Sequence, residues 1–489
     1  MRTPTAQETA IVSGRAGMQR VWLKVEIDRD NAGTWVDLTD LHGIDWVLGV
    51  SYGESVDITA WTARVTFRLH AFDNPEASLS PLMANSILND GGVMIQPYRR
   101  IKISTATVPI DDPKPSTFNL VFAGRIDSYE ISGNTVSVAC RDRTSDLQDC
   151  FIETEKTYGD DDPTSPANAN ELQDIIQDLI DDHYNTRADI VAGYSGAAST
   201  VAGTDLHLRD PASGGTVGVP YHLYSAQGTA AGPWNSADDT GWSLRSWVQQ
   251  KSPLFESLVR LADMIGYSLR FRWHNGSGIS DIVLVLEEPD RSSTTANLTL
   301  DPTTSANIVI KSLSLDITGI RNVWRVGFPR NGGTASSTVA TDAASISKYG
   351  RRYAEINEGS SSQIDTSTEA VAMRDALLAD TKEPVATVQI ETPYLYYVQL
   401  NDLIKVKADG RFLDSDQTLA VISRQNTIQQ GGAAKSVFVL QGTVQSAKRR
   451  KHASKQRVFF PSRSGPNLLQ SSSGSGLLQN GTLSNIGNE

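Results

Sequence analysis

The sequence has little cysteine and no apolar run long enough to cross a membrane. Cys140 and Cys150 are the only thiols among the 489 residues. Because a secreted chain of this size could carry a disulfide framework, we expect buried free thiols, although the spacing also allows a bridge across a turn. The first residues show no signal-peptide core. We therefore expect a protein that folds in a cytoplasm and leaves it, if at all, without signal-directed export.

Common catalytic and ligand-binding motifs are also missing. The sequence has no Gly-x-Ser-x-Gly elbow, no P-loop, no dinucleotide fingerprint and no His-Glu-x-x-His helix. Its seven histidines lie without the spacing of metal ligands: His42, His70, His183, His207, His222, His274 and His452. We predict no catalytic residue, no cofactor and no metal site.

Carboxylates are the group that could still support an enzyme, because a glycosidase needs only two of them. Residues 160–162 are three consecutive aspartates in a segment typical of a linker. A predicted helix presents four more on its polar face: Asp174, Asp178, Asp181 and Asp182. A row of exposed acids lacks the apolar pocket that raises the pKa of a catalytic acid, so we expect both groups to be solvated.

Acidic residues outnumber basic ones by 56 to 44, which gives a formal net charge of −12. This balance argues against nucleic acid or an anionic membrane as a partner of the whole surface.

Short strands are the dominant signal in what the sequence does contain. Residues 61–69 alternate between apolar and polar side chains, which predicts a strand with one buried face. Residues 99–103 predict another strand, and Gly133-Asn134 predicts a tight hairpin. Farther along, strands are predicted at residues 309–315, 322–328, 385–392, 403–407, 418–423 and 436–440.

Three helices interrupt the strands. An apolar stripe predicts one at residues 172–180, with Asn170 as a possible cap. Ser252, Pro253 and Gly266 bound a second at residues 253–265, followed by a strand that pairs with residues 281–287. A third follows a capping box at residues 366–369.

These patterns predict a mainly β fold with α+β elements, in which two β-barrel-like domains flank an α/β domain. The predicted parts are an N-terminal arm (1–17), a first barrel-like domain (18–158), an α/β domain (159–300) with an insertion at about 186–246, a second barrel-like domain (301–445) and a flexible C-terminal tail (446–489).

The insertion and the tail hold the candidate binding residues. Trp234 and Trp242 in the insertion could stack on sugars or form a small core of their own. A basic patch opens the tail: Lys448, Arg449, Arg450 and Lys451. It could bind nucleic acid or an acidic protein surface, dock on this chain or a neighbouring subunit, or be solvated. Two Leu-Leu-Gln repeats follow, with the leucines Leu468, Leu469, Leu477 and Leu478. These could hook onto a fibre or subunit, could add a strand to a neighbour's edge, or could belong to a disordered segment.

Four stretches carry a likeness to a known family. Residues 252–271 (SPLFESLVRLADMIGYSLRF) join a helix ending in Gly-Tyr to a strand. Residues 312–328 contain the motif Asp-Ile-Thr-Gly-Ile-Arg-Asn, and residues 391–407 contain Pro393 and Asn401-Asp402-Leu403-Ile404. Residues 122–149 end in the run RDRTSDLQD. Together they resemble the tail hub family of bacteriophages, which includes baseplate hubs of contractile tails and tail-tip hubs of long flexible tails.

The resemblance spans most of residues 20–445 and leaves out the insertion and the tail. It departs from the family pattern at Asn401, where the family usually has glycine before the aspartate; asparagine also tolerates left-handed φ.

The resemblance implies a structural virion protein at the distal tip of a tail. Such hubs are typically homotrimers whose two barrels per chain alternate around a ring, which matches a hexameric tube above and a central fibre or spike below. An acidic channel lining would let DNA pass during ejection without binding. The alternatives are a different tail or baseplate adaptor, a tail-associated cell-wall hydrolase and a carbohydrate-binding module.

Overall fold

The structure is a computed structural model. It describes residues 19–29, 34–41, 44–56, 58–69, 95–159, 170–185, 243–244, 246–249, 251–264, 268–276, 279–287, 295–330, 333–336, 338–357, 367–413, 415–430, 432 and 434–442. The N-terminal arm, the C-terminal tail and almost all of the predicted insertion lie outside these residues.

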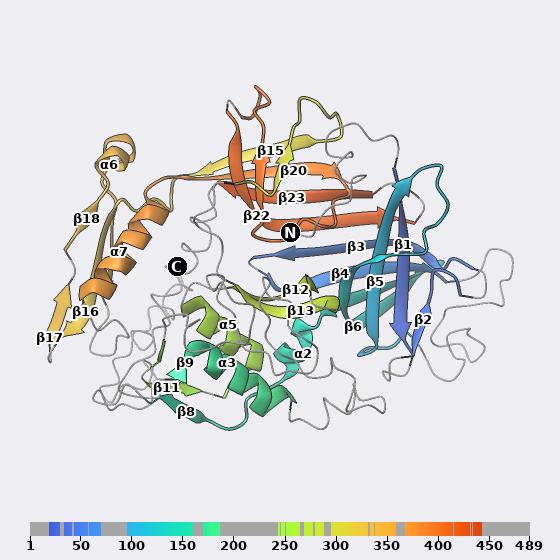
Figure 1. Cartoon of the computed structure of the whole chain (residues 1–489), viewed down its shortest axis with the longest axis horizontal. Coiled ribbons are helices and arrows are strands. Elements are labelled where there is room, and N and C mark those ends of the chain that lie inside the picture. Colours follow the sequence, from blue (N-terminus) through green and yellow to red (C-terminus); the bar gives the residue numbers. More distant parts are fainter. Residues whose placement is uncertain are drawn as a thin grey trace, which may run out of the picture.

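A single large sheet of thirteen strands dominates the fold (Figure 1), which confirms the mainly β prediction. Its strands are β1 (Gln19–Asp28), β2 (Trp35–Asp37), β3 (Val47–Ser55), β4 (Ile58–Arg68), β5 (Arg100–Pro109), β6 (Asn119–Ser132), β7 (Thr135–Asp142), β14 (Leu298–Leu300), β15 (Val309–Asp316), β20 (Val385–Pro393), β21 (Leu403–Val406), β22 (Gln417–Gln429) and β23 (Ala434–Gly442). Their order is β15-β20-β23-β22-β3-β4-β7-β6-β5-β1-β2, with β21 beside β22 and β14 beside β21.

Local sequence patterns explain the individual strands. In β4, Trp61, Val65 and Phe67 are buried while Thr62 and Arg64 are exposed, as the alternation predicts. The predicted hairpin joins β6 to β7, with Ser132 opposite Thr135 and a φ of 56° at Gly133. This positive φ is a conformation that glycine adopts without steric cost.

The sheet unites strands from both regions that were expected to be barrel-like domains. We call β1–β7 the N-terminal strand group, and β14, β15 and β20–β23 the C-terminal strand group. They meet where β22 pairs with β3, and the described strands include no closed barrel. The predicted domain bounds stay a prediction.

A helical layer lies below the sheet in Figure 1, with a β-hairpin between the two. Its elements are α2 (Thr144–Asp149), β8 (Lys156–Gly159), β9 (Asn170–Glu171), α3 (Leu172–Ile180), the π-helical turn η3 (Asp181–Asn185), β10 (Ser243–Leu244), β11 (Ser246–Gln249), α5 (Leu254–Met264), β12 (Ser268–Gly276) and β13 (Ile279–Glu287). Two of the three predicted helices and the predicted hairpin are confirmed as α3, α5 and β12–β13. Asn170 lies in β9, one residue too early to be the cap directly before Leu172.

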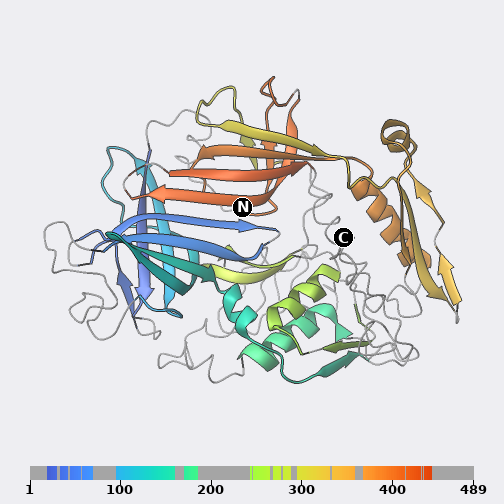
Figure 2. The ribbon, with the colours of Figure 1, turned by 180° about the vertical axis from the view of Figure 1, so that it is seen from behind.

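A small α/β module projects to one side, as both ribbon views show (Figures 1 and 2). The chain enters it after β15 and leaves it before β20. Its elements are β16 (Val323–Arg330), β17 (Gly333–Ser336), β18 (Ala340–Thr341), α6 (Ala343–Tyr349), β19 (Tyr353–Asn357) and α7 (Ser367–Thr381). Trp324, Val326, Ile356 and Leu377 belong to its own core. The strand predicted at residues 322–328 therefore forms, but in a separate sheet and not in the second strand group, which corrects the sequence-based interpretation.

Both cysteines are buried and free, as predicted. Burial raises the pKa of Cys140 well above its usual range, because a thiolate would lose its hydration. No helix among the described residues is both long and apolar enough to cross a membrane.

We predict that Gly53→Ala weakens the pairing of β3 with β22. A Cβ atom at Gly53 would lie 2.9 Å from the backbone oxygen of Arg424, so one of the two strands must shift. The free energy of unfolding should fall by about 1–3 kcal/mol in chemical denaturation. The control is Gly432→Ala, where the nearest atom is a side-chain carbon at 3.4 Å. Equal losses in both variants would contradict the close approach.

Candidate functional site at the junction of the two strand groups

The junction is the stretch where β22 pairs antiparallel with β3. Residues run in register from Ser423 opposite Ser55 to Gln429 opposite Gly49. The pairing joins segments that are more than 350 residues apart in the chain. Among the described strands, this ladder is the one that joins the N-terminal and C-terminal strand groups.

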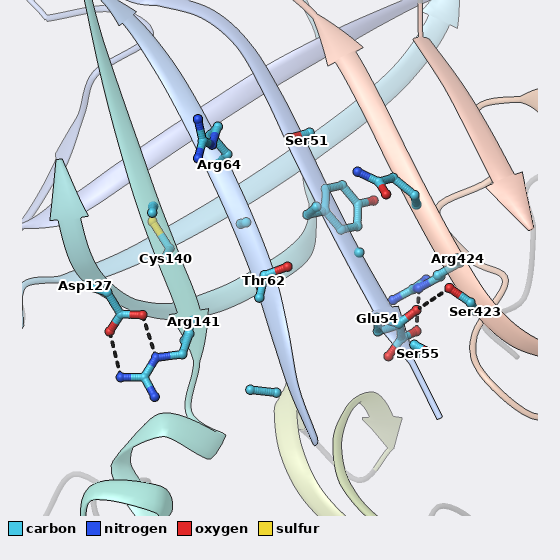
Figure 3. Close-up of a pocket in the computed structure, with 16 residues that line it drawn as sticks. Ser51, Glu54, Ser55, Thr62, Arg64, Asp127, Cys140, Arg141, Ser423 and Arg424 are labelled. Atoms are coloured by element: carbon cyan, nitrogen blue, oxygen red, sulfur yellow. Dashed lines mark hydrogen bonds and ion pairs between the residues drawn. The ribbon is translucent and has the colours of Figure 1, made fainter. Parts of the chain in front are cut away.

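A hollow of about 400 Å³ lies over the junction and continues across β4 and β7 (Figure 3). Small polar residues contribute much of its lining: Ser51, Ser55, Thr62 and Ser423. Arg64 from β4 and the Arg141–Asp127 pair add charge at its other side. Such a surface suits contact with a polar protein surface better than capture of an apolar small molecule.

A buried ion pair crosses the junction. The guanidinium of Arg424 in β22 contacts the carboxylate of Glu54 in β3, and the two side chains are 3% and 2% exposed. Arg424 also donates to the carbonyl oxygens of Tyr396, at 3.2 Å, and of Val398. The ring of Trp61 lies 5.0 Å from the guanidinium carbon. These partners offset the desolvation of the two charges, so the pair can persist inside the protein.

A buried hydroxyl network links the two strand groups beneath the sheet. Tyr394, from the segment after β20, lies 2.7 Å from the hydroxyl of Tyr52 in β3 and 3.0 Å from that of Thr105 in β5. The three hydroxyl groups satisfy one another away from water. They fix the distance between the C-terminal strand group and two strands of the N-terminal group.

Gln430 adds a further crossing contact directly after β22. Its side-chain amide donates to Asp45 at 2.7 Å and accepts from the backbone N–H of Leu23 in β1 at 3.1 Å. One side chain therefore connects the end of β22 to β1 and to the start of β3.

Charged residues also fasten the helical layer to the sheet. Arg125 in β6 is 7% exposed and contacts Asp146 at 3.1 Å and Asp149, both in α2. Arg141 in β7 binds Asp127 through two hydrogen bonds of 2.5 and 3.0 Å. Arg141, Asp146 and Asp149 belong to the RDRTSDLQD run (141–149), so these charges of the run have partners within the fold.

Asp142, in the same run, is buried and begins the turn into α2. Its carboxylate accepts from the backbone N–H of Thr144 at 3.2 Å and from the Thr144 hydroxyl at 3.0 Å. Burial raises the pKa of Asp142 well above its usual range, the charge of Glu54 raises it further, and the hydrogen bonds from Thr144 and Trp61 lower it. Asp301 forms the same turn with Thr303 at the surface.

The family-like position at Asn401 has the conformation that the sequence suggested. Its φ is 66°, in the left-handed region that asparagine tolerates. Its N–H donates to Val421 at 2.9 Å, and the Asp402 carboxylate accepts from Gln399 N–H at 2.7 Å. Asn401 thus adopts a backbone conformation that glycine also adopts readily.

The predicted binding residues all lie outside the described part of the chain. This holds for Trp234 and Trp242, for the basic patch (448–451) and for Leu468, Leu469, Leu477 and Leu478. Among the helix acids, Asp178 and Asp182 lie near the surface, where both bind Lys156, at 2.5 and 2.8 Å. Within the described residues, no group of three or more histidine, cysteine or acidic side chains is arranged to hold a metal ion.

The junction itself was missed by sequence reasoning. The sequence signal that could have indicated it is the pair Gly49 and Gly53. A Cβ atom at either position would lie 2.9 Å from a backbone oxygen of β22. Two glycines four residues apart in a strand indicate close backbone approach, but they do not name the partner strand.

Comparison with known proteins returned tail proteins among solved structures. The chain is similar to the 43 kDa tail protein of prophage MuSo2 from Shewanella oneidensis, at 13% identity over 86% of this chain and 97% of that chain, with a TM-score of 0.45. It is also similar to a tail protein from Neisseria meningitidis, at 11% identity over 86% and 96% of the two chains, with a TM-score of 0.49. Prophage tail protein gp18 from Listeria monocytogenes matches at 9% identity over 89% and 99%, with a TM-score of 0.46. No family model matches the sequence, and no curated protein matches it.

We predict that Arg424→Met is strongly destabilising because it leaves Glu54 buried without its charge partner. The expected loss is about 3–5 kcal/mol in the free energy of unfolding. Adding Glu54→Gln should recover part of this loss, since the uncompensated charge is then removed. A double-mutant cycle by chemical denaturation measures the coupling. Additive losses would show that the two side chains are not coupled.

Asp142 and Asp301 should make opposite contributions to the pH dependence of stability. Folding raises the pKa of Asp142, so the folded state holds the proton more tightly than the unfolded state. The contribution of Asp142 to the free energy of unfolding is therefore lost as pH rises from about 3.9 through the folded pKa. Hydrogen bonds from Thr303 and the charge of Lys407 lower the pKa of Asp301, so its contribution is lost as pH falls below about 3.9.

Denaturation of Asp142→Asn and Asp301→Asn over a pH series tests this contrast. As pH rises, the free energy of unfolding of the wild type should fall relative to that of Asp142→Asn. It should rise relative to that of Asp301→Asn. Parallel slopes would contradict the assignment.

Proposed function

We propose that this chain is a structural hub at the tail tip of a tailed phage or phage-like particle. It acts as a homotrimer that joins a hexameric tail tube to a central fibre or spike. Assembly takes place in the host cytoplasm, and the protein then belongs to the virion. Its function lies in surfaces and rigidity, and no residue is assigned a catalytic role.

The observation that carries this proposal is the junction of the two strand groups. One chain supplies two strand groups, antiparallel except for the pair β14–β21, and the pairing of β22 with β3 joins them edge to edge. Three such chains could present six strand groups around an axis, which is the number needed to meet a hexameric tube. A hub of this kind needs a fixed angle between its two groups. The Arg424–Glu54 pair and the Tyr394 hydroxyl network are suited to hold that angle.

The four family-like stretches support the proposal through where they fall. They correspond to α5 with β12, to β15 with β16, to the end of β20 through β21, and to β6 and β7 with α2. Two of them connect different parts of the fold: residues 312–328 lead from β15 into the α/β module, and residues 122–149 lead from β6 and β7 into α2. A resemblance spread over all these parts agrees with a shared architecture more than with a shared chemistry.

A cell-wall hydrolase finds less support in the described residues. Asp142 and Glu54 are one pair of acids that interact, because burial is the main cause that raises the pKa of Asp142 and the charge of Glu54 helps to raise it. Both are buried, at 0% and 5% exposure, and their oxygens are held by Thr144 and Arg424. Their low exposure and existing partners disfavour both as catalytic groups.

The remaining assignments follow from the hub. The net charge of −12 suits a channel through which DNA passes without binding. The basic patch (448–451) and the Leu-Leu pairs are proposed to contact other tail proteins or a neighbouring subunit. Glycan contact by Trp234 and Trp242 is the second candidate role of the insertion, and loss of glycan binding in Trp→Ala variants with an unchanged oligomer would favour it.

We predict that the purified full chain forms a trimer. Light scattering should then give three times the 53.0 kDa mass of one chain, and electron microscopy should show particles capping tail tubes. A variant ending at Thr443 tests whether the tail locks the subunits together. A monomer that also fails to cap tubes would contradict the hub, and digestion of cell walls would point to the hydrolase.

A further inference from the structure

Strand β15 exposes apolar side chains at one end of the large sheet. Leu313 and Leu315 in β15, and Ile317 directly after it, are 39%, 61% and 45% exposed. Among the described strands, β15 pairs with β20 alone. Both ribbon views show it at the outer edge of the C-terminal strand group (Figures 1 and 2). Soluble proteins usually protect such an edge with charges, proline or a covering segment.

Leu313 and Leu315 lie on a face of the sheet that is buried on the neighbouring strand β20. Leu313 lies opposite Val388 and Leu315 opposite Ala386 in the register of β15 with β20. Val388 is 0% exposed and belongs to the main core. Paired residues of antiparallel strands point to the same side of the sheet. The apolar face that is buried on β20 therefore continues onto β15, where it is exposed.

The last described strand ends close to this face. In β23, Gln441 lies opposite Thr387, and a Cβ atom at Gly442 would lie 3.3 Å from the Cβ of Ala386. Since Ala386 is opposite Leu315, Gly442 is two strand spacings, or about 10 Å, from Leu315. The 47 residues 443–489 therefore leave the fold beside the exposed face.

The chemistry of residues 443–489 fits such a face. Three apolar clusters stand among serine, glycine and asparagine: Val458-Phe459-Phe460, Leu468-Leu469 and Leu477-Leu478. β-branched and aromatic residues favour strands, and an exposed strand edge accepts an added strand through its backbone groups.

We propose that the outer edge and apolar face of β15 bind the C-terminal segment (443–489) of the same chain through these apolar clusters. Fifteen residues separate Gly442 from Val458, which is ample for a gap of about 10 Å. Such a short tether gives an effective concentration on the order of millimolar, far above that of a second copy in solution. The docked segment shields the edge from pairing with other chains. This inference does not rest on the hub function: it concerns the chain before assembly, whereas the contacts proposed above for Leu468, Leu469, Leu477 and Leu478 belong to the assembled particle.

Hydrogen exchange of the full chain tests the donor side. One variant replaces Leu468, Leu469, Leu477 and Leu478 with serine, and a second replaces Val458, Phe459 and Phe460 with serine. The control, Leu483→Ser with Ile486→Ser, removes apolar residues beyond the clusters. In at least one cluster variant, amides of residues 310–315 should exchange at least about tenfold faster, with no change in the control.

The acceptor side is tested by Leu315→Asp, with Val339→Asp as the control at an exposed position outside β15. Only Leu315→Asp should speed exchange in residues 458–478. Unchanged exchange in β15 in both cluster variants would overturn the proposal. It would also be overturned if protection of β15 in the wild type rose with protein concentration, because a second copy would then be the occupant.

Discussion

The pairing of β22 with β3 is the constraint on which the rest of the structure depends. It is the only place where the described strands of the two groups share a hydrogen-bonded ladder. The contact is close because Gly49 and Gly53 carry no side chain toward the backbone of β22. A side chain there would push the two groups apart and disturb the Arg424–Glu54 pair, the Tyr394 hydroxyl network and the Gln430 contacts together.

Buried polar groups at this junction act differently from an apolar core. An apolar interface between two strand groups tolerates small sliding, because hydrophobic contact has no direction. The ion pair and the hydroxyl network are directional, and each loses its partners if the groups rotate. The junction therefore favours one angle between the strand groups. A protein whose task is to hold a symmetric arrangement gains from that property.

Local sequence patterns predicted many of the individual strands and helices, but they could not predict which distant strands pair. Alternation in residues 61–69, the Gly133 turn and the bounds of α5 all depend on neighbours within a few residues. Left-handed φ at Asn401 could be predicted for the same reason, since it depends on one residue type. The β22–β3 pairing depends instead on which of many similar strands meet, and the alternating sequences of β3 and β22 fit several partners equally well.

The α/β module shows the same limit. Residues 322–328 read as a strand like any other, because the pattern reports a half-buried strand and not the sheet that contains it. The candidate site was missed for a related reason. Sequence motifs point to chemistry carried by rare residues, whereas the junction is built from Ser, Thr, Tyr, Gln and one Arg–Glu pair whose meaning appears only in three dimensions.

The two ends of the large sheet finish in different ways, and this difference matters for assembly. One end is the short strand β2, three residues long, beside β1. The other is β15, eight residues long with an apolar face. In a closed ring of identical chains, each subunit contacts its neighbour through two different surfaces, and the rotation between subunits closes the ring. An unprotected strand edge can instead pair with one chain after another and form an open-ended assembly. Covering β15 with a segment of its own chain would remove that open-ended route and leave association to surfaces with a defined geometry.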